Sequence, residues 1–239
     1  MSSASSGPTE PLFRSRRWRG RLASVEAAAV PSIVCALAWS IGIRGLLASP
    51  SVDSTPAEIT RFYADPQRGC NALVLLQIIL IGTVAFLWFI GVVRGRLGEV
   101  EPKLFGTVFL GGAILFAAVM LVGVAALAAP AVLIEASGRA PDPASVSMMR
   151  ALAVGLIAIF APRVSTLVVF STAALGRATG ALPVWLVWLS YVVGVAEFVT
   201  LTVAEPTVYV FPAWIALVSV VLLIRRPGRS VEPATNAEP

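Results

Sequence analysis

The residues of this sequence best suited to chemistry lie inside apolar runs. The stretch "IFAPRVSTL" places Arg163 beside Pro162, and "VGVAEFVTL" contains Glu197. An arginine inserted into hydrocarbon costs at least about 2.5–3.5 kcal/mol, so it needs a partner or a wet cavity. Pro162 lacks an N–H and displaces a carbonyl of the preceding turn, which predicts a kink with free backbone oxygens near the arginine. Ser165 and Thr166 add hydroxyl groups at the same place.

A counter-charge for Arg163 is predicted on the next apolar stretch. Glu197 lies at a depth about 7 Å different, and the two side chains lean toward each other, which closes most of that offset. Arg44 leans inward from the first apolar stretch and competes for the same carboxylate. Three roles fit this cluster: a structural ion pair, a site for a ligand, anion or proton, and a contact to another subunit.

The residue types needed for familiar catalytic or metal sites are missing. The chain has no histidine among 239 residues, which excludes histidine bases, the usual haem ligand and most zinc sites. Its two cysteines, Cys35 and Cys70, fall at the middle and the end of predicted helices, too far apart for a disulfide. There is no DxxD or GxSxG motif. The sequence therefore predicts no catalytic residue, no cofactor and no metal, and a protein that is not an enzyme.

The composition indicates that the chain lies in a membrane. Hydrophobic residues make up 57% and charged residues 13%, and the mean hydropathy is +0.86, whereas soluble domains are about 45–50% apolar and about 25% charged. Apolar stretches near the ~20 residues of a membrane span, the last somewhat short, cover about 25–47, 71–93, 104–129, 151–175, 182–203 and 208–224. Only helices satisfy such a backbone in lipid when no barrel pattern is present. We therefore expect an all-α membrane protein, a bundle of six transmembrane helices.

The basic residues predict the orientation of this bundle. Twelve of the 18 Lys and Arg residues fall on one side of the predicted membrane: Arg14, Arg16, Arg17, Arg19, Arg21, Arg94, Arg96, Lys103, Arg177, Arg225, Arg226 and Arg229. The positive-inside rule then places both termini in the cytoplasm. This distribution accounts for the net charge of +5 without a nucleic-acid partner. The dominance of arginine over lysine is typical of a high-GC bacterium, so we expect its cytoplasmic (inner) membrane.

The ends of the chain are predicted to lie outside the bundle. Polar, proline-containing tails at 1–12 and 227–239 are expected to be disordered. Residues 13–24 form a basic juxtamembrane segment, and the transmembrane domain covers 25–226. The first span is expected to act as an uncleaved anchor, because Glu26 interrupts the start of its apolar run.

Local signals predict helix starts in the two larger outer loops. A short helix should be capped near Ser54 or Thr55, with Pro56 in its first turn. Asp142 followed by a proline indicates that the fourth long helix begins outside the membrane and runs to about Leu175. The third stretch is rich in glycine and alanine, which predicts a central helix with a small-residue packing face.

Several phrases of the sequence resemble a known group of proteins. These are "FYADPQRGCNALVLLQIILIGTVAFLWFIGVVRGRL" (62–97), "GALPVWLVWLSYVVGV" (180–195) and the closing "IRRPGR". The chain resembles uncharacterised actinobacterial multi-pass integral membrane proteins, a bacterial family of unknown function with about six or seven spans. The resemblance implies the fold class and no site residue.

Two functions follow from these observations. The first is a membrane protein without a catalytic site that contacts the lipid bilayer and acts through self-association or a membrane-protein partner. The second is a permease or channel for a small solute or ion, with a polar site at Arg163 and Glu197. A water-accessible cavity around Arg163 would favour the second function, and tight apolar packing the first.

Overall fold

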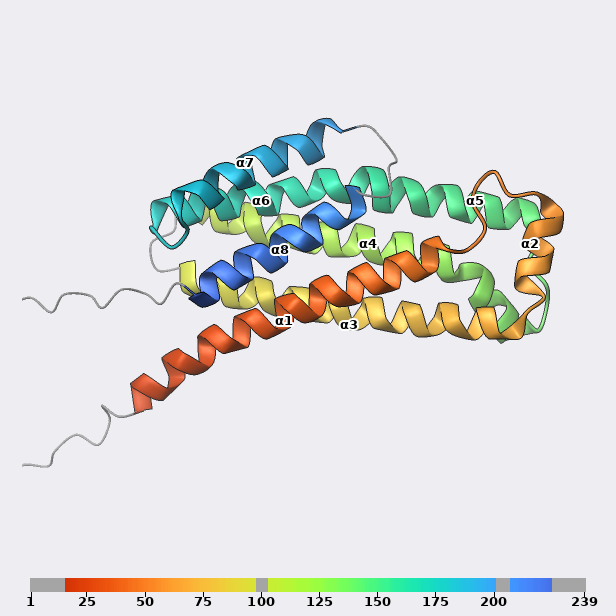
Figure 1. The fold of residues 1–239 in the computed structure, drawn as a ribbon, viewed down its shortest axis with the longest axis horizontal. Helices are drawn as coiled ribbons and strands as arrows, with labels where there is room; N and C mark the ends of the chain where they lie inside the picture. Colours follow the sequence, from red (N-terminus) through yellow and green to blue (C-terminus); the bar gives the residue numbers. More distant parts are fainter. Residues whose placement is uncertain (1–15, 98–102, 201–206, 225–239) are drawn as a thin grey trace, which may run out of the picture.

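The computed structural model describes residues 16–97, 103–200 and 207–224, and within these ranges all regular structure is helical (Figure 1). The helices are α1 (Arg16–Leu47), α2 (Pro56–Tyr63), α3 (Pro66–Leu97), α4 (Lys103–Ser137), α5 (Pro143–Val154), the π-helix η1 (Gly155–Phe160), α6 (Ala161–Ala178), α7 (Val184–Val199) and α8 (Thr207–Ile224). The predicted tails at 1–12 and 227–239 lie outside the described residues.

The first helix joins two segments that the sequence analysis separated. α1 begins at Arg16, within the basic segment predicted at 13–24, and continues through Pro31 to Leu47. The predicted boundary near residue 25 is therefore not a break in the backbone. Basic residues can start a helix as readily as apolar ones, because arginine has a high helix propensity.

In the described parts of the chain, four helical segments are long and apolar enough to cross a membrane: Val30–Leu47, Pro66–Gly91, Gly106–Ser137 and Pro143–Ala178. The last joins α5, η1 and α6 in 36 residues, about 54 Å at ~1.5 Å per residue. This confirms the prediction that the fourth long helix exceeds 30 residues. The fifth and sixth predicted spans form the shorter apolar helices Val184–Val199 and Val208–Leu222, so the count of six spans stays a prediction.

Both predicted helix starts in the two larger loops are confirmed. Thr55 caps α2, accepting from the backbone N–H of Glu58, while the Glu58 carboxylate accepts from the Thr55 N–H at 2.7 Å. Asp142 caps α5 by accepting from the N–H of Ser145 at 3.0 Å. These reciprocal bonds satisfy N–H groups that the first helical turn leaves without partners.

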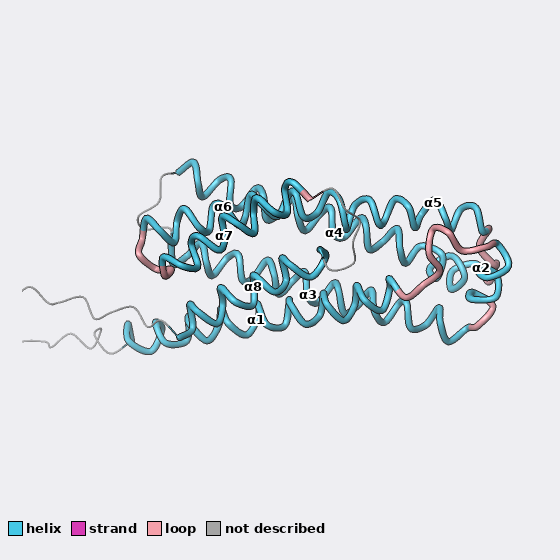
Figure 2. The backbone as a smooth tube through the Cα atoms, turned by 45° about the horizontal axis from the view of Figure 1, so that its top comes forward, coloured by secondary structure: helices cyan, strands magenta, loops and turns pink. Residues whose placement is uncertain are grey.

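The helices form an elongated bundle whose two ends differ. α7 and α8 lie along one end only, while α1, α3, α4 and the α5–α6 segment extend to the other (Figure 1). There α2 lies across the end of the bundle, beside the connecting loops (Figure 2). α4 packs against both α3 and α6, which agrees with its predicted central place.

Aromatic side chains from four helices fill the middle of the bundle. The ring of Trp39 (α1) lies 5.1 Å from that of Phe86 (α3) and 5.3 Å from that of Phe116 (α4), and Phe116 lies 4.6 Å from Phe211 (α8). The indole N–H of Trp39 donates to Thr83 Oγ1 at 3.2 Å. Tilted ring pairs at these distances stabilise the core beyond the area they bury.

Glycines on α4 let the adjacent helix approach closely. A Cβ added to Gly112 would lie 2.7 Å from Leu167 Cβ, and one added to Gly123 would lie 2.7 Å from Ile157 Cγ1. Side chains at these positions would therefore push α6 and η1 away. The predicted small-residue face of this helix is thus the face that holds the segment carrying Pro162 and Arg163.

Candidate functional site

The backbone preceding Pro162 is a π-helix. The N–H of Ala161 donates to the carbonyl of Leu156, five residues earlier, which is the π-helical pattern. Pro162 has no N–H to offer to either the fourth or the fifth preceding carbonyl. The irregularity predicted at Pro162 is therefore present, and it takes the form of a wide helical turn immediately before the proline.

Arg163 makes its contacts with backbone oxygens. One guanidinium nitrogen donates to the carbonyl of Ile159, one turn earlier, and Nη2 donates to the carbonyl of Thr200 at 3.1 Å. Thr200 is the residue that ends α7. Carbonyls at a helix C-terminus lack intrahelical donors and carry the negative end of the helix dipole, so an arginine there is favourable. Arg163 thus ties the end of α7 to the middle of the long α5–α6 segment.

Glu197 meets α6 at a different residue. Its carboxyl oxygen Oε2 lies 2.5 Å from Ser165 Oγ, and Ser165 Oγ also lies 2.6 Å from the carbonyl oxygen of Pro162. The Glu197 side chain is only 5% exposed. Thr166, also predicted for this site, donates its hydroxyl proton back to the carbonyl of Arg163 at 2.6 Å.

Among the described residues, no ion pair at 4.0 Å or less joins Arg163 or Arg44 to Glu197; the ion pair within that distance is Arg68 with Asp65, at 3.2 Å, outside this site. Glu197 contacts Ser165, whereas Arg163, two positions earlier on α6, donates to Thr200 at the end of the same helix α7. A polar site shared by Arg163, Glu197 and Arg44 stays a prediction. Arg44 is exposed on the surface of α1. The sequence placed these charges near the same depth and could not fix the rotation of each helix.

A small cavity borders Glu197. Its volume is about 10 Å³, room for about one water molecule. The second carboxyl oxygen, Oε1, is buried and has no hydrogen-bond partner among the described residues. The lining also includes apolar and aromatic residues, namely Trp39, Ile43, Phe116, Met120, Ile157, Ala161, Pro162, Val208, Phe211 and Pro212. Arg163 does not line this cavity.

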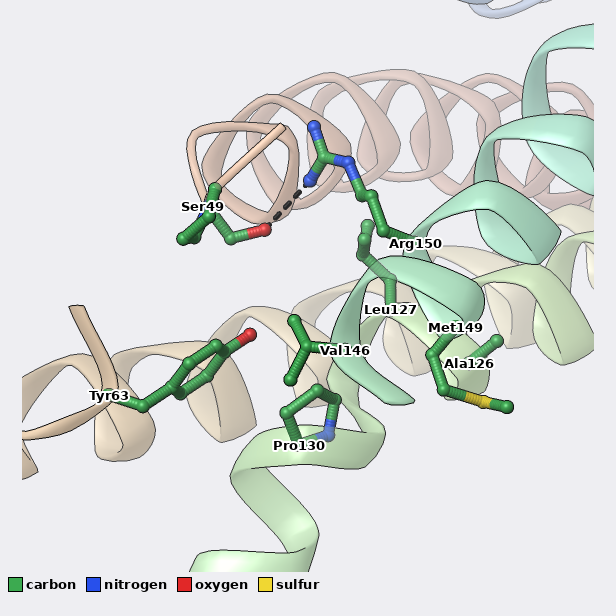
Figure 3. Close-up of a pocket in the computed structure, with 9 residues that line it drawn as sticks. Ser49, Tyr63, Ala126, Leu127, Pro130, Val146, Met149 and Arg150 are labelled. Atoms are coloured by element: carbon green, nitrogen blue, oxygen red, sulfur yellow. Dashed lines mark hydrogen bonds between the residues drawn. The ribbon is translucent and has the colours of Figure 1, made fainter. Parts of the chain in front are cut away.

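A buried arginine that the sequence analysis did not single out joins two helices near the other end. Arg150 is 9% exposed and donates to the carbonyls of Leu46 at 3.3 Å and Leu47 at 2.9 Å, and to Ser49 Oγ at 2.7 Å (Figure 3). It thereby satisfies the last carbonyls of α1. Its position between Val146 and Ala153 on a buried stripe was the signal that could have identified it.

Two titratable groups near this end respond to their surroundings. Burial raises the pKa of the Tyr63 hydroxyl above its usual value, and the positive charge of Arg150 opposes this rise. Hydrogen bonds from the backbone and side chain of Thr55 hold the pKa of Glu58 below its usual value. Tyr63 and Arg150 border a further cavity with room for about one water molecule. The arrangement is that of a helix cap with a small adjoining void.

Metal-binding clusters are not apparent in the parts of the chain that the structure describes. No three cysteine, aspartate or glutamate side chains come together in them as a metal site would require. Cys35 is buried, Cys70 is exposed, and both thiols are free.

No family model, no curated protein and no solved structure matches this chain. The case for a function therefore depends on its own residues.

Proposed function

We propose that this chain is a multi-pass protein of the bacterial cytoplasmic membrane that acts through association, with itself or with a partner membrane protein, and does not catalyse a reaction. The observation that carries the proposal is the packing of the polar groups in the described part of the bundle. Arg163 and Glu197, which the sequence offered as a transport site, both have contacts within the bundle, and the cavity beside Glu197 has room for about one water. The six spans, the cytoplasmic termini and the actinobacterial resemblance belong to the same proposal.

The outward face of α4 supports association through helix packing. Thr107 and Gly111 are exposed and four residues apart, so they lie about one helical turn apart on the same face of α4. A Cβ added to Gly111 would meet nothing within 4 Å. In membranes, helices associate where small residues at this spacing let two backbones approach each other. The face is therefore suited to a helix of a second copy or of a partner.

The substitution Gly111→Leu tests this proposal, with Gly91→Leu as the matched control. Gly91 on α3 is also exposed with nothing within 4 Å, so both variants should fold. We expect the wild-type protein to form dimers in lipid vesicles, counted by single-molecule photobleaching, and Gly111→Leu to weaken them about tenfold, or ~1.4 kcal/mol. Gly91→Leu should leave them unchanged. Monomers at every protein density, with no partner recovered by cross-linking in native membranes, would contradict the proposal.

One observation favours the permease as a second candidate. Glu197 lines a cavity and its buried Oε1 atom has no hydrogen-bond partner among the described residues, a combination that a proton or small cation pathway would use. The same vesicles decide between the two functions: a flux of protons or small ions that depends on Glu197, measured with an entrapped indicator dye, would favour the permease.

A further inference from the structure

Among the described residues, Glu197 is the buried acidic side chain of the bundle. Among these residues, no cation forms an ion pair with its carboxylate at 4.0 Å or less, and the guanidinium of Arg163 donates to the carbonyls of Ile159 and Thr200. An ionised carboxylate in an apolar interior is costly unless it is paired, and such groups become neutral instead. The surroundings of Glu197 therefore favour a carboxylic acid.

The contacts of the Ser165 hydroxyl also indicate that Glu197 is protonated. Ser165 Oγ lies 2.6 Å from Pro162 O and 2.5 Å from Glu197 Oε2. Both distances are those of short O–H···O hydrogen bonds. A serine hydroxyl carries a single proton and can donate it to one of the two oxygens. The other contact needs a proton of its own. Pro162 O is a carbonyl and has none to give, so that proton must be on Glu197.

We propose that Glu197 and Ser165 form a proton-binding site inside the bundle. Glu197 Oε2–H donates to Ser165 Oγ, and the Ser165 hydroxyl donates to the carbonyl oxygen of Pro162. The ligand of the site is one proton, and Glu197 lines a cavity with room for about one water. This inference does not depend on the association proposed above.

Among the described residues, Glu197 is the titratable group that lines the cavity. The other lining residues are Trp39 and Ile43 from α1, Phe116 and Met120 from α4, Ile157 from η1, Ala161 and Pro162 from α6, and Val208, Phe211 and Pro212 from α8. The nearby cation on α6, Arg163, donates to the carbonyl of Thr200, three residues after Glu197. Its guanidinium is bonded to backbone oxygens and forms no ion pair with Glu197 at 4.0 Å or less.

Infrared difference spectroscopy of the protein in lipid vesicles tests the site directly. At neutral pH we expect the spectrum of wild type minus Glu197→Gln to contain the C=O stretching band of one protonated carboxylic acid. The matched control, Glu135→Gln, removes an exposed acid of α4 and should remove carboxylate bands instead. Loss of carboxylate bands in Glu197→Gln, with no carboxylic acid band, would overturn the proposal.

A second variant keeps the test decisive if Glu197→Gln does not fold. Ser165→Ala retains the acid but removes its acceptor, so the same C=O band should move to higher wavenumber while its area is preserved. An unchanged band position would show that Glu197 does not donate to Ser165. The absence of any carboxylic acid band in the wild-type protein, folded at neutral pH, would overturn the proposal without a variant.

Discussion

At the scale of single residues, Arg150 and Arg163 are accommodated in the same way. Arg163 donates to the carbonyl of Thr200 at the end of α7, and Arg150 donates to the carbonyls of Leu46 and Leu47 at the end of α1. In each case a helix C-terminus supplies both lone pairs and the negative end of a dipole. A guanidinium with several fixed donors can satisfy two or three such oxygens at once.

The contacts of Arg150 give a prediction for stability. Arg150→Lys keeps the positive charge but loses the planar guanidinium, whose nitrogens donate to two carbonyls and to the Ser49 hydroxyl. Hydrogen bonds to charged groups contribute about 1.5–3 kcal/mol, so we expect the free energy of unfolding to fall by about that amount. The measurement is reversible denaturation in detergent, followed by circular dichroism.

The control for this prediction is Arg139→Lys. Arg139 is exposed on the same side of the predicted membrane, and surface substitutions of this kind change stability by about 0.5 kcal/mol or less. Equal losses in the two variants would contradict the capping role of Arg150.

The sequence predicted part of the candidate site and missed the rest for a geometric reason. It indicated that backbone oxygens near Pro162 would accept from Arg163, because a proline always removes a donor from a helix. It did not indicate Thr200, because where α7 ends depends on tertiary packing. It paired Glu197 with Arg163 and did not predict the contact of Glu197 with Ser165, since the choice between these residues depends on helix rotation.

At the scale of helices, local rules were most successful at the helix starts. The caps at Thr55 and Asp142 follow from residues within three positions of each start. The π-helix before Pro162 was beyond sequence reasoning, because a proline predicts only that the regular hydrogen-bond pattern fails. The π-helix packs closely against α4, where a Cβ added to Gly123 would lie 2.7 Å from Ile157 Cγ1, and such long-range packing cannot be read from the local sequence.

The close contact of α4 with α6 gives a prediction at this scale. Gly112→Ala adds a methyl group 2.7 Å from Leu167 Cβ, an atom fixed to the backbone that cannot turn away. Overpacking of this kind costs about 1–3 kcal/mol, so we expect the thermal midpoint to fall by several degrees. Gly91→Ala, which meets nothing within 4 Å, should instead leave the midpoint unchanged or raise it, and a loss as large as that of Gly112→Ala would refute the contact.

At the scale of the whole molecule, composition predicted the membrane and helical character of the chain, and four segments have the required length. Hydropathy alone could not decide whether the last two apolar stretches cross the bilayer. Their helices, Val184–Val199 and Thr207–Ile224, have 16 and 18 residues, near the lower limit of a span. Orientation depends on the distribution of charges and stays a prediction.

The free cysteines provide a test of orientation. Cys70 is exposed at the end of α3 predicted to face outward, and Cys35 is buried in α1. We expect a membrane-impermeant maleimide to label intact cells at Cys70, and Cys70→Ser to abolish the labelling. Labelling that requires lysed cells would place this end of the bundle in the cytoplasm, opposite to the predicted orientation.

The unequal lengths of the helices have a consequence for the surrounding lipid. α7 and α8 are about 24 and 27 Å long, whereas the adjacent α5–α6 segment is about 54 Å. If α7 and α8 cross the bilayer, as we propose, its hydrocarbon layer, about 30 Å thick, would have to thin beside them and not beside the long helices. This one-sided hydrophobic mismatch would deform the bilayer along a single flank. Two copies that turned their short flanks toward each other would share one deformed patch and be drawn together by the membrane itself.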